Sequence, residues 1–178
     1  IDAGTYNVVL QLSSTTNYKW SDNTTTNKTV SWKINPKSVA VTWGSTVSFT
    51  YNGSAQGPTV SVATGVSGET MNVTRTTGTN VGSYTSTATC ASVSGGQASC
   101  NNYTLTGNTK AFTIGKKAVT VTASSNSKTY NGTALTQTSG CASSSGLVSG
   151  HTATCTNSGT ITNAGSTTNT LSTVVIKN

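Results

Sequence analysis

The chain has 178 residues, only 7% of them charged, and a formal net charge of +7. Charged residues make up about 25% of an average soluble protein, so hydration here must come from other side chains, and 82 residues are Thr, Ser or Asn. Thr suits strands, whereas Asn, Ser and Gly suit turns. Good helix formers are scarce, with Glu69 the one glutamate, so the composition argues against amphipathic helices.

Basic and apolar residues are dispersed along the chain. Lys116-Lys117 is the one adjacent basic pair, and Arg75 is the one arginine. Nucleic-acid-binding proteins gather basic residues into a patch or stripe, so the sequence predicts no nucleic-acid partner. A membrane-spanning helix needs about 20 successive apolar residues, and no such run occurs. We therefore expect no membrane span.

Short segments of alternating apolar and polar residues predict half-buried β-strands. In chain order these segments are 5–10, 30–34, 39–43, 83–88, 112–114 and 119–123. No segment sustains the 3.6-residue period of an amphipathic helix. The predicted fold class is therefore all-β.

Asparagine and glycine mark the turns expected between these strands. Asn-Gly pairs are strong signals for type I′ hairpin loops, which we expect at Asn52-Gly53 and Asn131-Gly132. A second glycine motif occurs three times, and there we expect a positive φ or a bulge at the start of a strand. Its glycines are Gly4, Gly82 and Gly165.

Several motifs recur in the same order at a nearly constant spacing. Tyr-Asn-Gly-Ser-Ala begins at Tyr51 and recurs as Tyr-Asn-Gly-Thr-Ala 79 positions later, at Tyr130. The strand containing Ile34 recurs 80 positions later around Ile114. The spacing predicts tandem repeats: the C-terminal part of a preceding repeat at 1–36, a complete repeat at 37–116, and the N-terminal part of a following repeat at 117–178.

The joints between these repeats are short. At the first joint the predicted strand that ends at Ile34 passes through Asn35-Pro36 into the next predicted strand. A joint of this length resists bending more than a Gly/Ser linker does, which favours an extended rod. Trp32 and Trp43 flank Pro36, and we expect these three residues to pack together at the joint, because small β domains rely on a few large side chains.

Four cysteines fall into two pairs that are close in sequence, Cys90 with Cys100 and Cys141 with Cys155. Each pair encloses a turn-rich segment, so disulfides within the pairs would join the arms of two hairpins, although four cysteines allow three pairings. Disulfides imply an oxidising, extracellular setting. The alternative is four buried free thiols. A zinc site is not expected, since no Cys-x-x-Cys pair occurs and His151 is the one histidine.

The sequence offers little for catalysis. Acid/base chemistry needs positioned carboxylates or a histidine, but Asp2, Asp22 and Glu69 are far apart in sequence, and His151 occupies the turn position equivalent to Glu69. Calcium sites need clustered carboxylates. We therefore expect no enzyme activity, no metal and no cofactor.

The order of these motifs resembles a known class of bacterial repeat. Tyr-Asn-Gly-Thr-Ala from Tyr130, then Ser-Gly-His-Thr around His151, then Thr-Asn-Ala-Gly-Ser around Gly165 are similar to the MBG/YDG type of bacterial surface repeat, as are the Asn-Tyr and closing-strand motifs. The resemblance covers essentially the whole chain. It implies tandem immunoglobulin-like sandwich repeats, or β-grasp-like repeats as the alternative, in secreted or cell-wall-attached adhesin-like proteins.

Three functions remain open from the sequence. The first is a structural spacer, a stalk or fibre segment of a bacterial surface protein, located outside the cell. The second is binding of a host glycan or glycoprotein by the repeats themselves. The third is a head-to-tail fibre, in which like chains are joined by strand complementation. The partners expected are therefore neighbouring repeats of the same or like chains, and a glycan or glycoprotein in the second case.

Overall fold

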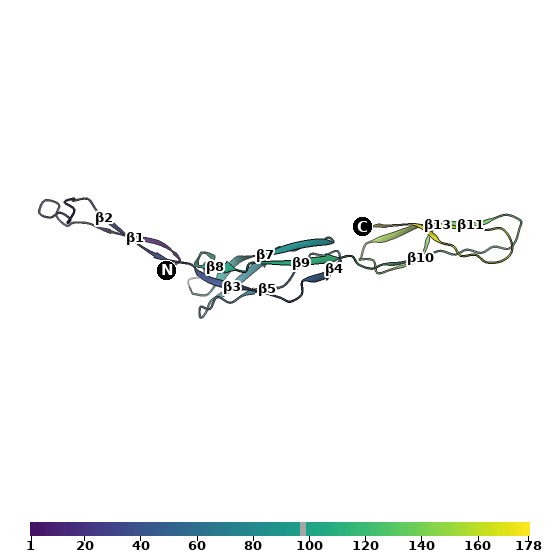
Figure 1. Cartoon of the computed structure of the whole chain (residues 1–178), viewed down its shortest axis with the longest axis horizontal. Coiled ribbons are helices and arrows are strands. Elements are labelled where there is room, and N and C mark those ends of the chain that lie inside the picture. Colours follow the sequence, from purple (N-terminus) through teal and green to yellow (C-terminus); the bar gives the residue numbers. More distant parts are fainter. Residues whose placement is uncertain (97–98) are drawn as a thin grey trace. The chain divides into compact units, whose positions relative to one another are not determined.

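The structure is a computed structural model in which residues 1–96 and 99–178 are described, and they form strands and one short 3-10 turn. The all-β expectation is confirmed. In chain order (Figure 1) the elements are β1 (Gly4–Leu10), β2 (Lys28–Ile34), β3 (Lys37–Trp43), β4 (Ser48–Thr50), β5 (Val60–Val62), β6 (Thr70–Arg75), β7 (Gly82–Ser94), η1 (Cys100–Asn102), β8 (Tyr103–Thr106), β9 (Thr109–Gly115), β10 (Thr120–Ala123), β11 (Leu135–Ser139), β12 (Cys141–Ser145), β13 (Thr152–Ile161) and β14 (Leu171–Lys177).

Within the described residues, the strands form five small sheets. Their strand orders are β1-β2, β5-β3-β8, β4-β9-β7-β6, β10-β12 and β11-β13-β14. The β1–β2, β6–β7, β10–β12, β11–β13 and β13–β14 ladders are antiparallel, whereas β3–β8 and β4–β9 are parallel. Parallel neighbours need a crossover connection, so the sheets of residues 37–115 are not a simple meander.

Contacts divide the chain into two compact units. The first comprises 1–47, 57–77 and 84–112, and the second comprises 48–56, 78–83 and 113–178. In the first unit, Val39, Met71, Ala88 and Phe112 are buried. These side chains come from two sheets, an arrangement consistent with a β-sandwich. In the second unit the buried apolar residues are Ile114 and Cys155.

The Asn-Gly turns differ from the expected hairpin loops. β4 precedes Asn52-Gly53 but pairs in parallel with β9, and β10 pairs with β12, which leaves Asn131-Gly132 between strands that are not partners. Gly53 and Gly132 have φ angles of 80° and 76°, but neither asparagine has a positive φ, which a type I′ turn requires at both positions. Each Asn Oδ1 instead accepts a hydrogen bond from the backbone amide two residues on, at 2.9 and 3.1 Å, an Asx turn.

The second glycine motif takes two forms. Gly4 and Gly82 are the first residues of β1 and β7, and neither has a positive φ. Gly165 has a φ of 148° and lies outside any strand. The same motif therefore begins a strand twice and remains irregular in its third occurrence.

Candidate functional site

The two disulfides join Cys90 to Cys100 and Cys141 to Cys155, with Cα–Cα separations of 5.9 and 5.3 Å. The expected pairing is therefore confirmed. The bridges do not join hairpin arms, however. The first connects β7 to η1, and the sequence between its two cysteines includes residues 97–98, which lie outside the described residues. The second connects β12 to β13, which belong to different sheets. Two disulfides indicate an oxidising compartment.

The tryptophans beside Pro36 make their contacts in different places. Trp32 on β2 packs against Tyr6 on β1, with ring centroids 5.4 Å apart, and it remains 51% exposed. Trp43 at the end of β3 donates its indole N–H to the Gly107 carbonyl at 2.8 Å. Packing of the two tryptophans with Pro36 remains a prediction.

Each acidic side chain has a structural partner. Asp2 accepts a hydrogen bond from the Asn102 amide at 2.9 Å. Asp22 forms an ion pair with Lys28, and Glu69 accepts a hydrogen bond from the Tyr103 hydroxyl. The bond to Glu69 is the main cause of a raised Tyr103 pKa, and desolvation adds to it.

Across the described ranges 1–96 and 99–178, no cluster of three or more His, Cys, Asp or Glu side chains occurs. No helix in this described part is long and apolar enough to span a membrane.

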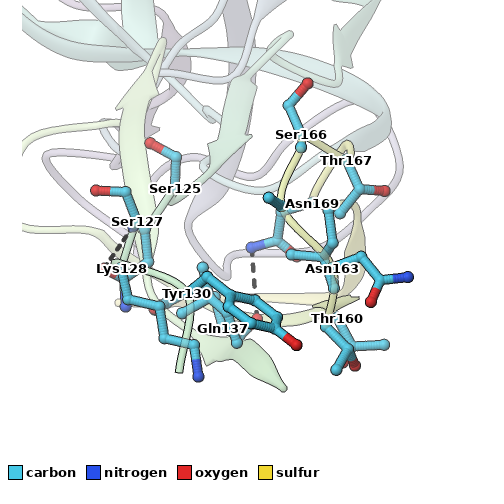
Figure 2. Close-up of a pocket in the computed structure, with 17 residues that line it drawn as sticks. Ser125, Ser127, Lys128, Tyr130, Gln137, Thr160, Asn163, Ser166, Thr167 and Asn169 are labelled. Carbon is cyan, nitrogen blue, oxygen red and sulfur yellow. Dashed lines mark hydrogen bonds between the residues drawn. The ribbon is translucent and has the colours of Figure 1, made fainter. Parts of the chain in front are cut away.

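A cavity of about 400 Å³ lies beside the segment that leads into β14. Figure 2 shows Ser125, Ser127 and Lys128 along one side of it, and Ser166, Thr167 and Asn169 along the other. Two recurring motifs therefore meet at this cavity, since its lining includes Tyr130 of one and residues 163–166 of the other.

The cavity has an aliphatic part and a polar part. Leu135 and Ile161 face each other across the β11–β13 ladder and both line the cavity. Asn169 donates from Nδ2 to the Ser124 carbonyl at 2.7 Å and to the Gln137 carbonyl at 3.4 Å, which fixes the segment before β14 against β11.

Lys128 contributes the one charged group of the cavity lining. Its amine donates to Asn131 Oδ1, Thr133 Oγ1 and the Ala134 carbonyl, at 2.9, 2.7 and 3.1 Å. These bonds hold the amine against the neighbouring Asx turn. The rest of the lining is neutral, so the cavity is suited to an uncharged guest that combines apolar side chains with backbone or hydroxyl groups.

Sequence reasoning missed this cavity. A signal for it was available in the sequence. Motifs that precede the closing strand 109–115 in the middle segment recur in 117–178. The sequence placed Gly165 and Asn131-Gly132 in turns but did not bring their two motifs together. A scan against protein-family models finds no match to the chain, and comparisons with curated proteins and with solved structures find none either.

Proposed function

We propose that the chain is a tandem array of β repeats of about 80 residues that serves as a structural spacer in an exported bacterial surface protein. The observation that supports it is the recurrence of the same strand pairings at the spacing of the sequence motifs. Repeat proteins of this kind stack like units along one direction, so that each contacts only its neighbours.

One recurring pairing involves the strand that follows the glycine motif. In 1–36, β1 pairs with β2, and Tyr6 contacts Trp32 at 5.4 Å. In 37–116, β7 neighbours β9, and Tyr84 stacks on Phe112 at 5.2 Å. Tyr6 and Tyr84 both stand two residues after the motif glycine, so the two aromatic pairs occupy equivalent positions.

Two further pairings recur between 37–116 and 117–178. The β3–β5 ladder, with Val41 opposite Val62, corresponds to the β10–β12 ladder, with Val121 opposite Ser144. The β6–β7 ladder, with Thr70 opposite Ser94, corresponds to the β13–β14 ladder, with Thr152 opposite Lys177. All these ladders stay within the segments 1–36, 37–116 and 117–178, which supports the proposed repeat boundaries. An immunoglobulin-like sandwich is proposed for the repeat because the buried side chains of 37–116 come from two sheets.

The spacer proposal predicts an elongated particle. A compact globule of this length has a radius of gyration of about 16 Å, and small-angle X-ray scattering of the oxidised chain should give a clearly larger value with an asymmetric distance distribution. A radius near that of a globule, in a monomeric sample, contradicts the proposal. Scattering from the fully reduced chain provides the control for expansion caused by partial unfolding.

Glycan binding by the repeats has less support. Sugar sites commonly present aromatic faces, but Tyr130 is the one aromatic residue that lines the cavity of about 400 Å³. Trp20 donates its indole N–H to the Thr26 carbonyl at 2.7 Å, and Trp32 packs on Tyr6. A glycan array at high protein concentration tests this alternative directly.

A further inference from the structure

β9 occupies a defined slot in the middle segment. It lies between β4 and β7 in the sheet order β4-β9-β7-β6. On one side Phe49 is opposite Ile114 in the parallel β4–β9 ladder. On the other side the Ala88 amide donates to the Asn108 carbonyl at 2.8 Å, and Tyr84 stacks on Phe112, so β9 runs antiparallel to β7. Phe112 and Ile114 are 3% and 2% exposed, so this strand supplies much of the buried apolar surface.

The segments beside β9 are strands because β9 pairs with them. β4 has its one ladder with β9 in the described residues. The β6–β7 ladder ends at Arg75–Ala88 and is extended by one hydrogen bond from the Thr76 amide to the Thr87 carbonyl, at 3.2 Å, so residues 82–86 rely on β9 for strand pairing. If β9 were absent, β4 would lose its strand partner and residues 82–86 would lose theirs.

The corresponding segments of 117–178 are not strands, and the backbone bond from the Ser158 amide to the Thr170 carbonyl, at 3.0 Å, matches the bond from Thr76 to Thr87. Residues 127–129 correspond to β4, and residues 165–170 correspond to the first part of β7, and neither segment is a strand. β14 begins at Leu171, the counterpart of Ala88, and lies at the edge of the sheet β11-β13-β14. Strand structure is therefore missing at the two places that a β9-like strand would pair with.

The cavity occupies the position between these two segments. Residues 125–128 line one side, and 163–167 with Asn169 line the other (Figure 2). Leu135 and Ile161 supply an aliphatic surface there. In 37–116 the side chains of Phe112 and Ile114 fill the position between the two segments. In 117–178 the equivalent position is a cavity of about 400 Å³.

We propose that this cavity is the acceptor slot for one extended peptide strand of the β9 type, with an aromatic residue and an isoleucine two positions apart. The strand runs parallel to 127–129 and antiparallel to 165–171, with its isoleucine opposite Lys128 and Gly165. Strand addition of this kind draws affinity from main-chain hydrogen bonds and specificity from pockets for alternate side chains. The inference uses the repeat equivalence but does not depend on the spacer function.

The chain contains suitable donor sequences. Phe112 and Ile114 define the pattern in β9, and Trp32 and Ile34 repeat it in β2. The acceptor segment 165–171 differs from the equivalent part of β7 at the position of the stacking tyrosine. Thr167 stands two residues after Gly165, where the other two occurrences of the motif have Tyr6 and Tyr84. The acceptor therefore lacks the ring that stacks on the aromatic residue of the donor.

The test fuses the sequence of residues 108–117 to the C-terminus of the full chain through a Gly/Ser linker of about 14 residues, the separation between β7 and β9. Such a linker gives an effective concentration on the order of millimolar. We expect slower hydrogen exchange at 127–129 and 165–170 and a raised Tm. The matched control carries proline at the position of Thr113, which removes a backbone donor. Equal protection in the two fusions, or no protection in either, overturns the proposal.

A gain-of-function variant makes the test specific for register. Thr167→Tyr restores the aromatic partner, and a well-placed aromatic pair should tighten binding of the free peptide 108–117 by roughly two- to tenfold. Thr168→Tyr points to the opposite face of an extended strand and should leave the affinity unchanged. Equal effects of the two variants contradict the proposed register.

The same exchange measurement distinguishes a peptide from a glycan. Protection of the same residues by an oligosaccharide, with none from the peptide, identifies the cavity as a glycan site and overturns the strand proposal. Scattering from the unfused chain tests the spacer function independently.

Discussion

Hydroxyl and amide side chains take the place of charges on the surface of this protein. Several cross-strand hydroxyl pairs lie within hydrogen-bond distance, and each such pair contributes roughly 0.2–1 kcal/mol to strand association. The pairs are Thr74–Thr89, Thr122–Ser143 and Thr156–Ser172, at 2.7 to 3.0 Å. The abundance of Thr and Ser thus has a role in strand pairing as well as in hydration.

Asp22 is the acidic residue whose pKa is lowered by its neighbours. The ion pair with Lys28, aided by two hydrogen bonds from Thr24, lowers the pKa of Asp22 from 3.8 to about 2. We expect Lys28→Gln to raise this pKa toward 3.8, because the largest stabilising contact of the carboxylate is lost. Carboxyl-carbon NMR titration measures it, with Lys33→Gln on the same strand as the control.

The sign of the linked stability change follows from the lowered pKa. A folded-state pKa below the unfolded value stabilises the fold at pH above about 4, and this contribution disappears as the pH falls through about 2. Lys28→Gln should therefore reduce the dependence of β1–β2 stability on pH in this acidic range. An Asp22 pKa that stays near 2 in the variant would show that Thr24 alone determines it.

Strand positions could be predicted from the sequence better than strand partners. The alternating pattern at 39–43 corresponds to β3 (Lys37–Trp43), and that at 5–10 corresponds to β1 (Gly4–Leu10). The pattern at 83–88 marks only the first part of β7, which continues to Ser94. Alternation reports local burial, whereas the parallel β4–β9 ladder depends on segments more than sixty residues apart. The cavity beside β14 likewise depends on residues distant in sequence, since residues from 125–130 and 159–169 line it together, so local pattern could not reveal it.

The Cys141–Cys155 bridge is expected to be important for the sheets of residues 120–177. It connects β12 to β13 across two sheets, in a segment whose buried residues are Cys155 and Asn157. Replacing both cysteines with alanine should lower the free energy of unfolding of this segment by about 3 kcal/mol, because the unfolded chain regains its loop entropy. Urea unfolding followed at β13 and β14 by NMR measures the change.

Replacement of Cys90 and Cys100 by alanine provides the matched comparison. That bridge closes a loop of similar length, so its entropic effect is similar, but it lies in the segment with the larger core. We expect the double variant to retain the native signals of β13 and β14 at denaturant concentrations where the variant without Cys141 and Cys155 has lost them. The reverse order would show that the stabilities of the two segments are not set by their cores.

Burial is distributed unevenly along the molecule. The largest fully buried side chains are Ile114, Pro58 and Ser86, and all three lie in 37–116. No residue of 1–36 is buried, and several large side chains of the β1–β2 pair are exposed. These side chains are Val8, Val9, Leu10, Val30 and Trp32, at 43% to 57% exposure. Apolar burial is the main favourable contribution to folding, so the three segments should differ in stability.

Native-state hydrogen exchange can rank the segments. Local opening free energies follow burial and contact density, so amides of β7 and β9 should exchange most slowly, with protection on the order of a thousandfold or more. An isolated two-stranded ribbon is only marginally stable, and amides of β1 and β2 should be protected within about tenfold. Residues 120–177 should fall between these limits and become less protected when the disulfides are reduced. Protection of β1–β2 equal to that of β7 would instead mean that the ribbon unfolds only together with the core of 37–116.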